Sequence, residues 1–164
     1  MKKAPIPANE ANRLKALKKI GILDTAPEQR FDRITKLATK ELKVPISTIS
    51  VIDEDREWFK SCQGLDISQD NRETSFCGHA LFSKGIMIIE DTTLDDRFKD
   101  NPHVIKEGIR FYAGIALYDK TTNLPVGVFC IKDYKPRIFS IQETAKFIEL
   151  SKQAETEFNK KTEV

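Results

Sequence analysis

Residues able to do chemistry are concentrated between positions 58 and 82. This stretch holds an indole, an ammonium, a thiol and an imidazole, at Trp58, Lys60, Cys77 and His79. Thiolate and imidazole are good zinc ligands, and a Cys–His pair can activate a nucleophile. Residues two apart on a helix point in nearly opposite directions, however, so we do not expect Cys77 and His79 to act together. The stretch indicates a binding site without a complete catalytic signature.

A metal centre is not expected from the remaining cysteines and histidine. Further zinc ligands would have to come from Cys62, Cys130 or His103, and none of these shows ligand spacing. His79 is then a hydrogen-bonded pocket or capping residue. Cys77 is either a buried small hydrophobe or, if exposed near a helix N-terminus, a favoured thiolate. No cofactor is assigned.

A second set of candidate residues lies in a β-rich segment near position 110. Arg110 and Tyr112 alternate with apolar neighbours, so both are expected on one face of a strand. Arg110 can hold a carboxylate or phosphate there, and Tyr112 adds an apolar plate with one hydroxyl. Alternatively, Arg110 pairs with Asp91 or Asp96 and fixes a covering loop. Trp58 either stacks on a ligand ring or packs in the core.

Composition limits the class of protein. The chain has 164 residues, which suits one domain, and its 27 basic and 25 acidic residues give no field that would attract nucleic acid or an anionic membrane. No apolar run approaches the roughly 20 residues needed to cross a bilayer, and the basic start lacks the apolar core of a secretory signal. Three widely spaced cysteines favour reduced thiols. We therefore expect a cytoplasmic protein.

Capping residues and helical spacing of apolar residues predict three long helices. They cover residues 10–20, opened by Asn9 and ended by Gly21; about 26–42, opened by a capping box at Thr25–Glu28; and 141–160, opened by a capping box at Ser140–Glu143. A short helix is expected at 75–83. Strands are expected at 46–53, 56–62, 86–89, 109–119 and 126–133.

This order of elements predicts an α+β fold. An antiparallel β-sheet of about six strands carries the N- and C-terminal helices on one face. Only residues 64–83 and 91–108 remain to cover the other face, and loops over a sheet usually leave a concave pocket. Residues 1–164 are expected to form one domain, with 10–158 as its body and 1–8 as a flexible tail.

Several motifs resemble those of GAF domains, the cytoplasmic small-molecule sensor modules, over about residues 10–158. The motifs are Gly21–Thr25, Arg30–Ile34, Trp58–Ser61, Ser75–Ala80, Asp91–Thr92, Asp96–Phe98, Asn101–Pro102, Ile109–Gly114 and Gly127–Ile131. They are similar to the variety found at the N-terminus of bacterial sensor histidine kinases and diguanylate cyclases. Ala116–Leu117 and Leu124–Pro125 depart from that variety's usual pattern.

The resemblance implies a six-stranded sheet between helical layers, a ligand between the sheet and the covering loops, and a homodimer through the terminal helices. It implies a sensor or signalling module for an unknown small molecule. Because no effector domain is seen, we expect the module to act through a separate effector protein or to sequester its ligand. The predicted ligand-binding residues are Trp58, Lys60, Ser75, Cys77, His79, Asp91, Arg110 and Tyr112.

Three other functions stay open. Free methionine sulfoxide reductases also have the GAF fold and use cysteines, but no cysteine lies between Cys77 and Cys130, where that family keeps its nucleophile. A dimerisation module with a vestigial pocket would explain the broad apolar surface of the last helix. Bilin attachment at Cys77 is the third, although its flanking residues do not resemble the phytochrome pattern.

Overall fold

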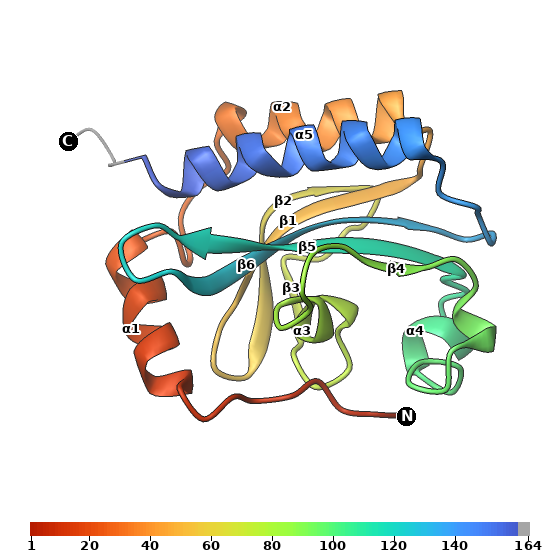
Figure 1. Ribbon diagram of the computed structural model, residues 1–164, viewed down its shortest axis with the longest axis horizontal. Coiled ribbons are helices and arrows are strands. Elements are labelled where there is room, and N and C mark those ends of the chain that lie inside the picture. Colours follow the sequence, from red (N-terminus) through yellow and green to blue (C-terminus); the bar gives the residue numbers. More distant parts are fainter. Residues whose placement is uncertain (161–164) are drawn as a thin grey trace.

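The computed structural model describes residues 1–160 and has a six-stranded antiparallel sheet between two layers (Figure 1). The strand order is β3-β2-β1-β6-β5-β4. The strands are β1 Ile46–Ile52, β2 Arg56–Gln63, β3 Gln69–Asn71, β4 Met87–Ile89, β5 Phe111–Asp119 and β6 Leu124–Asp133. The predicted α+β GAF-like class is confirmed. The short edge strand β3 falls in a segment that the sequence predicts to be a loop.

Two long helices, α2 (Gln29–Glu41) and α5 (Ile141–Phe158), lie side by side on one face of the sheet (Figure 1). The capping box that opens α5 is present, with Ser140 accepting from the Glu143 amide. The capping box predicted for α2 is wrong. That helix begins after Glu28, so Thr25 lies outside it. The Thr25 hydroxyl instead donates to the carbonyl of Ile22 and accepts a hydrogen bond from the buried ammonium of Lys60.

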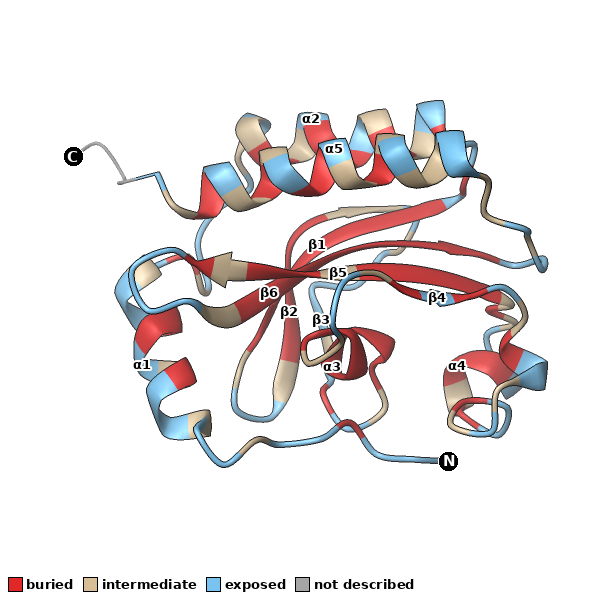
Figure 2. Ribbon diagram, in the orientation of Figure 1, coloured by how far each residue is buried: buried red, intermediate tan, exposed pale blue. Residues whose placement is uncertain are grey.

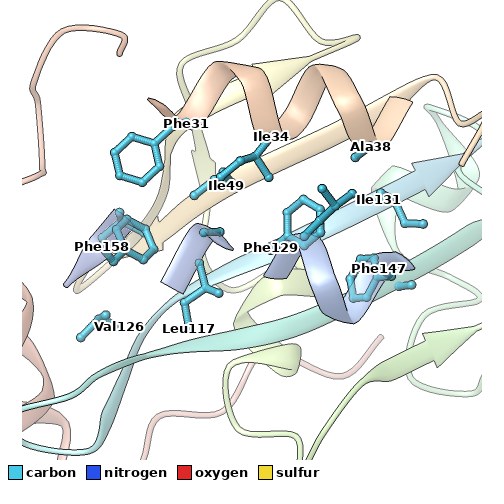
Figure 3. Close-up of a cluster of buried hydrophobic side chains, with 14 of the residues drawn as sticks. Phe31, Ile34, Ala38, Ile49, Leu117, Val126, Phe129, Ile131, Phe147 and Phe158 are labelled. Carbon is cyan, nitrogen blue, oxygen red and sulfur yellow. The ribbon is translucent and has the colours of Figure 1, made fainter. Parts of the chain in front are cut away.

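The helix-side core fills the space between α2, α5 and the sheet. Buried apolar side chains from both helices meet those of β1, β5 and β6 (Figures 2 and 3). The largest are aromatic, and the stacked pair Phe129 and Phe147 has ring centroids 4.9 Å apart. Burial of this apolar area is the main favourable contribution to folding, at roughly 25 cal/mol per Å². Because alternate side chains of β1, β5 and β6 fill this core, the side chains between them point to the opposite face of the sheet.

Short elements cover the opposite face. They are α3 (Phe76–Ala80), the 3₁₀ turn η1 (Thr92–Leu94) and α4 (Pro102–Ile105). Their apolar side chains pack on the sheet in a second cluster that includes Phe76, Phe98, Tyr112 and Val128, all fully buried. This cover is the one predicted for residues 64–83 and 91–108, and it is packed against the sheet.

Helix α1 (Glu10–Ile20) does not join the α2–α5 layer. It packs on β6 beside the β5–β6 turn, at one end of the sheet (Figure 1). Glu10 accepts from the buried guanidinium of Arg13 at 2.8 Å and also pairs with Arg72. Arg72 in turn donates to the carbonyl of Asp53 at 3.0 Å. These contacts tie α1 and the β1–β2 turn to the segment that enters α3.

The first eight residues, predicted as a flexible tail, have no secondary structure and run along α3 (Figure 1). The amide of Lys2 donates to the carbonyl of Arg97, and that of Ala4 donates to the carbonyl of Glu73. Ala4 is buried, and a side-chain carbon at Gly78 would approach its methyl group to 2.6 Å. Gly78 therefore permits the close approach of this N-terminal segment.

Within the described residues, no helix combines the length and the apolar character required to cross a bilayer.

Candidate functional site

Charged and thiol side chains lie on the sheet face beneath α3, inside an otherwise apolar layer. We call this set the polar cluster: it consists of Glu57 and Asp70 from β2 and β3, Cys77 from α3, Tyr112 from β5, and Cys130 and Lys132 from β6. The strand register accounts for this grouping, because Glu57 pairs with Asp70 and Tyr112 with Lys132, and paired residues share a face. The cluster spans five of the molecule's elements.

Glu57 places a carboxylate in this layer without full compensation. The residue is only 2% exposed, and its Oε2 is buried with no hydrogen-bond partner among the described residues. Asp70 lies directly opposite on β3, so two acidic side chains stand side by side. Like charges directly opposite each other destabilise a sheet, and a buried acceptor without a donor costs about 1–3 kcal/mol. This arrangement favours a cationic group beside Glu57.

Lys132 supplies the cluster's positive charge. It is 6% exposed, its Nζ lies 5.7 Å from the centroid of the Phe76 ring, and no described carboxylate oxygen lies within 4.0 Å of it. Burial alone would lower the pKa of Lys132. The surrounding negative groups outweigh burial and raise this pKa, the contributors being Cys130, Glu57, Cys77 and Asp70. Lys132 is therefore charged at neutral pH, with no anion in direct contact.

Two buried thiols lie between these charges, and each has its own hydroxyl partner. Tyr112 donates its hydroxyl to Cys77 Sγ at 3.1 Å, and Thr48 Oγ1 lies 3.0 Å from Cys130 Sγ. Burial raises the pKa values of Cys77 and Tyr112. Burial also opposes ionisation of Cys130, but the neighbouring Cys77 thiol and the charge of Lys132 lower its pKa overall. Cys130 is thus the more acidic thiol.

One end of the cluster reaches the surface between β3 and α4. The Asp70 side chain is 30% exposed, and its Oδ2 lies 3.5 Å from Nε2 of His103. On its other side, His103 Nδ1 lies 2.8 Å from the Glu107 carboxylate. His103 also contacts the Phe76 ring of α3, with ring centroids 6.0 Å apart. The acidic end of the polar cluster is therefore its most accessible part.

The structure brings two of the predicted site residues, Cys77 and Tyr112, into direct contact. Three others hold the cover in place. Ser75 caps α3 by accepting from the Gly78 amide at 2.9 Å, and Asp91 caps η1 by accepting from the Thr93 amide. His79 donates from Nε2 to the carbonyl of Lys2 at 3.1 Å, and burial lowers its pKa. These three side chains already have partners within the chain.

Arg110 lies on the predicted face, where it fastens α4. Its NH1 donates to the carbonyl of Val104 at 2.8 Å and to that of Ile109 at 3.3 Å. It thus fixes the cover, as the structural alternative predicts, but through backbone carbonyls. Neither Asp91 nor Asp96 is its partner, since Asp91 caps η1 and Asp96 pairs with Lys99.

Neither Trp58 nor Lys60 lies beside Tyr112, and Trp58 packs in the core, which is the second of its two expected roles. Trp58 pairs with Val51 and packs in the helix-side core. Lys60 turns the same way: its Nζ bonds the carbonyl of Ala26 at 2.6 Å and pairs with Glu28 at 2.7 Å. Alternation along β2 holds for these two residues, which share a face, but that face is turned towards α2 and away from the polar cluster. The β-bulge at Lys60 changes the face only of the residues that follow it.

Sequence reasoning missed Glu57 and Lys132. The available signal was a charged residue inside a predicted strand and next to a large apolar residue, Trp58 or Ile131, since charged residues are rarely buried without a partner. Asp70 was missed for another reason, because its strand has three residues and lies in a polar segment. The pairing of the strands brings all three residues to the site.

Surface hollows lie elsewhere, and two of them are identified by their lining residues. One, of about 520 Å³, follows β2 and the loop before β3 and includes Lys60, Cys62 and Asp66. The other, of about 580 Å³, lies between α1 and the β5–β6 turn and includes Lys15 and Leu124. In the described part of the chain, no three His, Cys, Asp or Glu side chains gather so that they could hold a metal ion.

Comparison of the sequence with protein families gives a match to the GAF domain over residues 26–158. The chain is also 40% identical, over 134 residues, to the cyclic di-GMP phosphodiesterase PA2567 of Pseudomonas aeruginosa. The matched region covers 81% of this chain but only 23% of that relative, so it is one part of a larger protein there.

Solved structures with the same fold include the GAF domain of an Acinetobacter phosphoenolpyruvate-protein phosphotransferase. Its TM-score is 0.63 at 17% identity, with 90% of this chain and 92% of that chain covered. Free methionine-R-sulfoxide reductase from Neisseria meningitidis, solved with its substrate, gives a TM-score of 0.63 at 14% identity, with 96% and 95% covered. At these identities the likeness shows a shared fold.

Proposed function

This chain belongs to the GAF domain family, and from that premise we propose that it is a small-molecule sensor whose ligand binds at the polar cluster beneath α3. The supporting observation is a pair of buried opposite charges, Glu57 and Lys132, for which residues 1–160 provide no direct ionic partner. Buried charges are normally paired or neutralised. A polar ligand between them would supply the missing contacts.

Ligand binding would act on the cover. Cys77 belongs to α3 and Phe76 of the same helix faces Lys132, so a ligand at the cluster touches the element that encloses it. The N-terminal segment lies on the outer side of α3 and would follow its movement. We propose that this displacement carries the signal to a separate effector protein or effector segment in the cytoplasm.

Thermal unfolding with a library of cellular metabolites tests this function, together with native mass spectrometry of the protein as isolated. A ligand at one hundred times its Kd raises the free energy of unfolding by about 2.7 kcal/mol. The site variant is Glu57→Gln with Lys132→Met, and the control variant is Glu54→Gln with Lys106→Met, at two exposed positions. We expect a metabolite that stabilises the wild type and the control but not the site variant. Equal stabilisation of all three proteins, or of none, would reject the site.

We also propose a homodimer, formed through α5. Ile141 is 85% exposed, and Ala145 and Ile148 continue the same side of the helix. Because α1 packs on β6 and not in the α2–α5 layer, the dimer proposed here uses α5 without the pairing of first and last helices expected from the sequence. Light scattering should show a dimer that Ile141→Lys disrupts, while Leu94→Lys, at an equally exposed position, does not. A wild-type monomer at every concentration would contradict this.

A thiol-dependent enzyme is the second candidate, because the thiols of Cys77 and Cys130 are neighbours in the polar cluster and each influences the pKa of the other. Both are fully buried and burial raises the pKa of Cys77, which opposes reactivity. Reduction of free methionine sulfoxide with a thiol reductant provides the assay. Turnover that Cys77→Ser abolishes would favour the enzyme over the sensor.

A further inference from the structure

We propose that the ligand is a small extended zwitterion, whose ammonium binds Glu57 and Asp70 and whose anionic group binds Lys132. The inference rests on the proposed function, since it specifies the chemistry of the same site. It depends on three features of the polar cluster: an acidic end, a basic end and the distance between them.

The acidic end consists of Glu57 and Asp70, opposite each other on β2 and β3. Asp70 has the imidazole of His103 at 3.5 Å, whereas Oε2 of Glu57 has no donor in the part of the chain that the structure describes. An ammonium between the two carboxylates would relieve their repulsion and donate to the orphaned oxygen. Hydrogen bonds between ionised groups are about twice as strong as neutral ones.

The basic end is Lys132. Its ammonium lies over the Phe76 ring and has no described carboxylate within 4.0 Å. An ammonium has three donors and no acceptor, so the matching ligand group is an anion such as a carboxylate. A purely anionic ligand would meet the two acids at the other end, and a purely cationic one would meet Lys132. Only a ligand that carries both charges satisfies both ends.

The register fixes the separation of the two ends. Glu57 pairs with Ile52 and Lys132 pairs with Ile46, at opposite ends of β1. At about 3.3 Å per residue, their backbones are separated by roughly 20 Å along that strand. The long side chains shorten this distance, and the negative charge of Glu57 still acts on Lys132. The ligand's charges must therefore be several bonds apart, farther than in glycine.

Asp70 suggests the route of entry. It is the most exposed member of the cluster and lies between β3 and α4. The ammonium of an entering ligand would first meet Asp70 and then Glu57, while the anionic end moves beneath α3 towards Lys132. The cover would have to yield at α3 or α4, which are helices of five and four residues.

A series of ω-amino acids from glycine to 6-aminohexanoate measures this separation directly. Isothermal titration at millimolar concentration should show the tightest binding at a chain length above glycine. N-acetylation or amidation of the best compound should weaken binding about tenfold to hundredfold, because each removes one charge-assisted hydrogen bond. Glu57→Gln and Lys132→Met should each cause a similar loss. Glu54→Gln and Lys106→Met should leave the affinity unchanged.

Two results separate this inference from the proposed function. If other metabolites stabilise the wild type but not the Glu57/Lys132 double variant, while no ω-amino acid binds, the zwitterion is wrong and the sensor site stands. If capped compounds bind as tightly as their parents, the charge assignment is wrong. If no compound of either kind distinguishes the site variant from its control, both proposals fail. The capped compounds use wild-type protein, so this comparison does not depend on the folding of a variant.

Discussion

Glu10→Gln should destabilise the protein by removing the charge that holds two buried arginines. Burial alone would raise the pKa of the Glu10 carboxyl, but hydrogen bonds from Arg13 and Arg72, with their charges, lower it from 4.5 to about 2. The Arg13 side chain is 0% exposed and that of Arg72 is 3% exposed. Both guanidinium groups would lose Glu10, the one carboxylate that pairs with them among residues 1–160.

The size of the effect follows from linkage. A carboxyl whose pKa is 4.5 unfolded and about 2 folded contributes about 3.4 kcal/mol at neutral pH, at about 1.36 kcal/mol per pH unit. The Glu10 side chain is 16% exposed, and solvent screening reduces this contribution to about 2 kcal/mol. Because the folded pKa is the lower one, the contribution is complete above pH 4.5 and is lost as pH falls towards 2.

Urea unfolding followed by the fluorescence of Trp58, the only tryptophan, measures this difference. At pH 7 the variant should be less stable than the wild type by about 2 kcal/mol, and the gap should narrow steadily between pH 4.5 and 3. Glu149→Gln, which breaks an exposed pair with Lys146, should cost less than about 0.5 kcal/mol. The reasoning is refuted if Glu10→Gln costs no more than this control at pH 7, or if its gap is the same at pH 3.

Three further predictions concern the cover and the opposite face. Lys60→Met should lower the free energy of unfolding by about 2 kcal/mol, because it removes the Nζ hydrogen bonds to Thr25 and to the carbonyl of Ala26 together with the pair to Glu28. Ligand affinity should not change, and a loss of affinity would place Lys60 in the site. Alkylation mapped by mass spectrometry should modify Cys62 before the two buried cysteines. The rate at Cys62 should rise towards pH 11, since burial raises the pKa of this thiol to about 11, and faster labelling of a buried thiol would contradict the order. Gly78→Ala should displace Ala4 and lower the free energy of unfolding by about 1–3 kcal/mol. Hydrogen exchange of residues 1–8 should therefore accelerate, and unchanged exchange would show that α3 and this segment are not coupled.

Much of the fold was predictable because its signals are local. Gly21 ends α1 in the left-handed conformation, and Ser140 with Glu143 opens α5, as the sequence indicates. Both depend on residues within one turn of each other. The capping box at Thr25 was predicted wrongly because the hydroxyl has a competing partner in Lys60, 35 positions away in the chain. Local patterns do not record such partners.

The candidate site was predictable only in part. The sequence by itself determined that the residues around α3 form the cover, and it identified Cys77 and Tyr112 as members of that layer. Only the tertiary structure decided that Glu57, Asp70 and Lys132 meet beneath the same helix, and that Trp58 and Lys60 face away from it. The physical reason is that alternation along a strand says which side chains share a face, whereas packing against distant segments decides which of the two faces is turned to α2 and which to the cover.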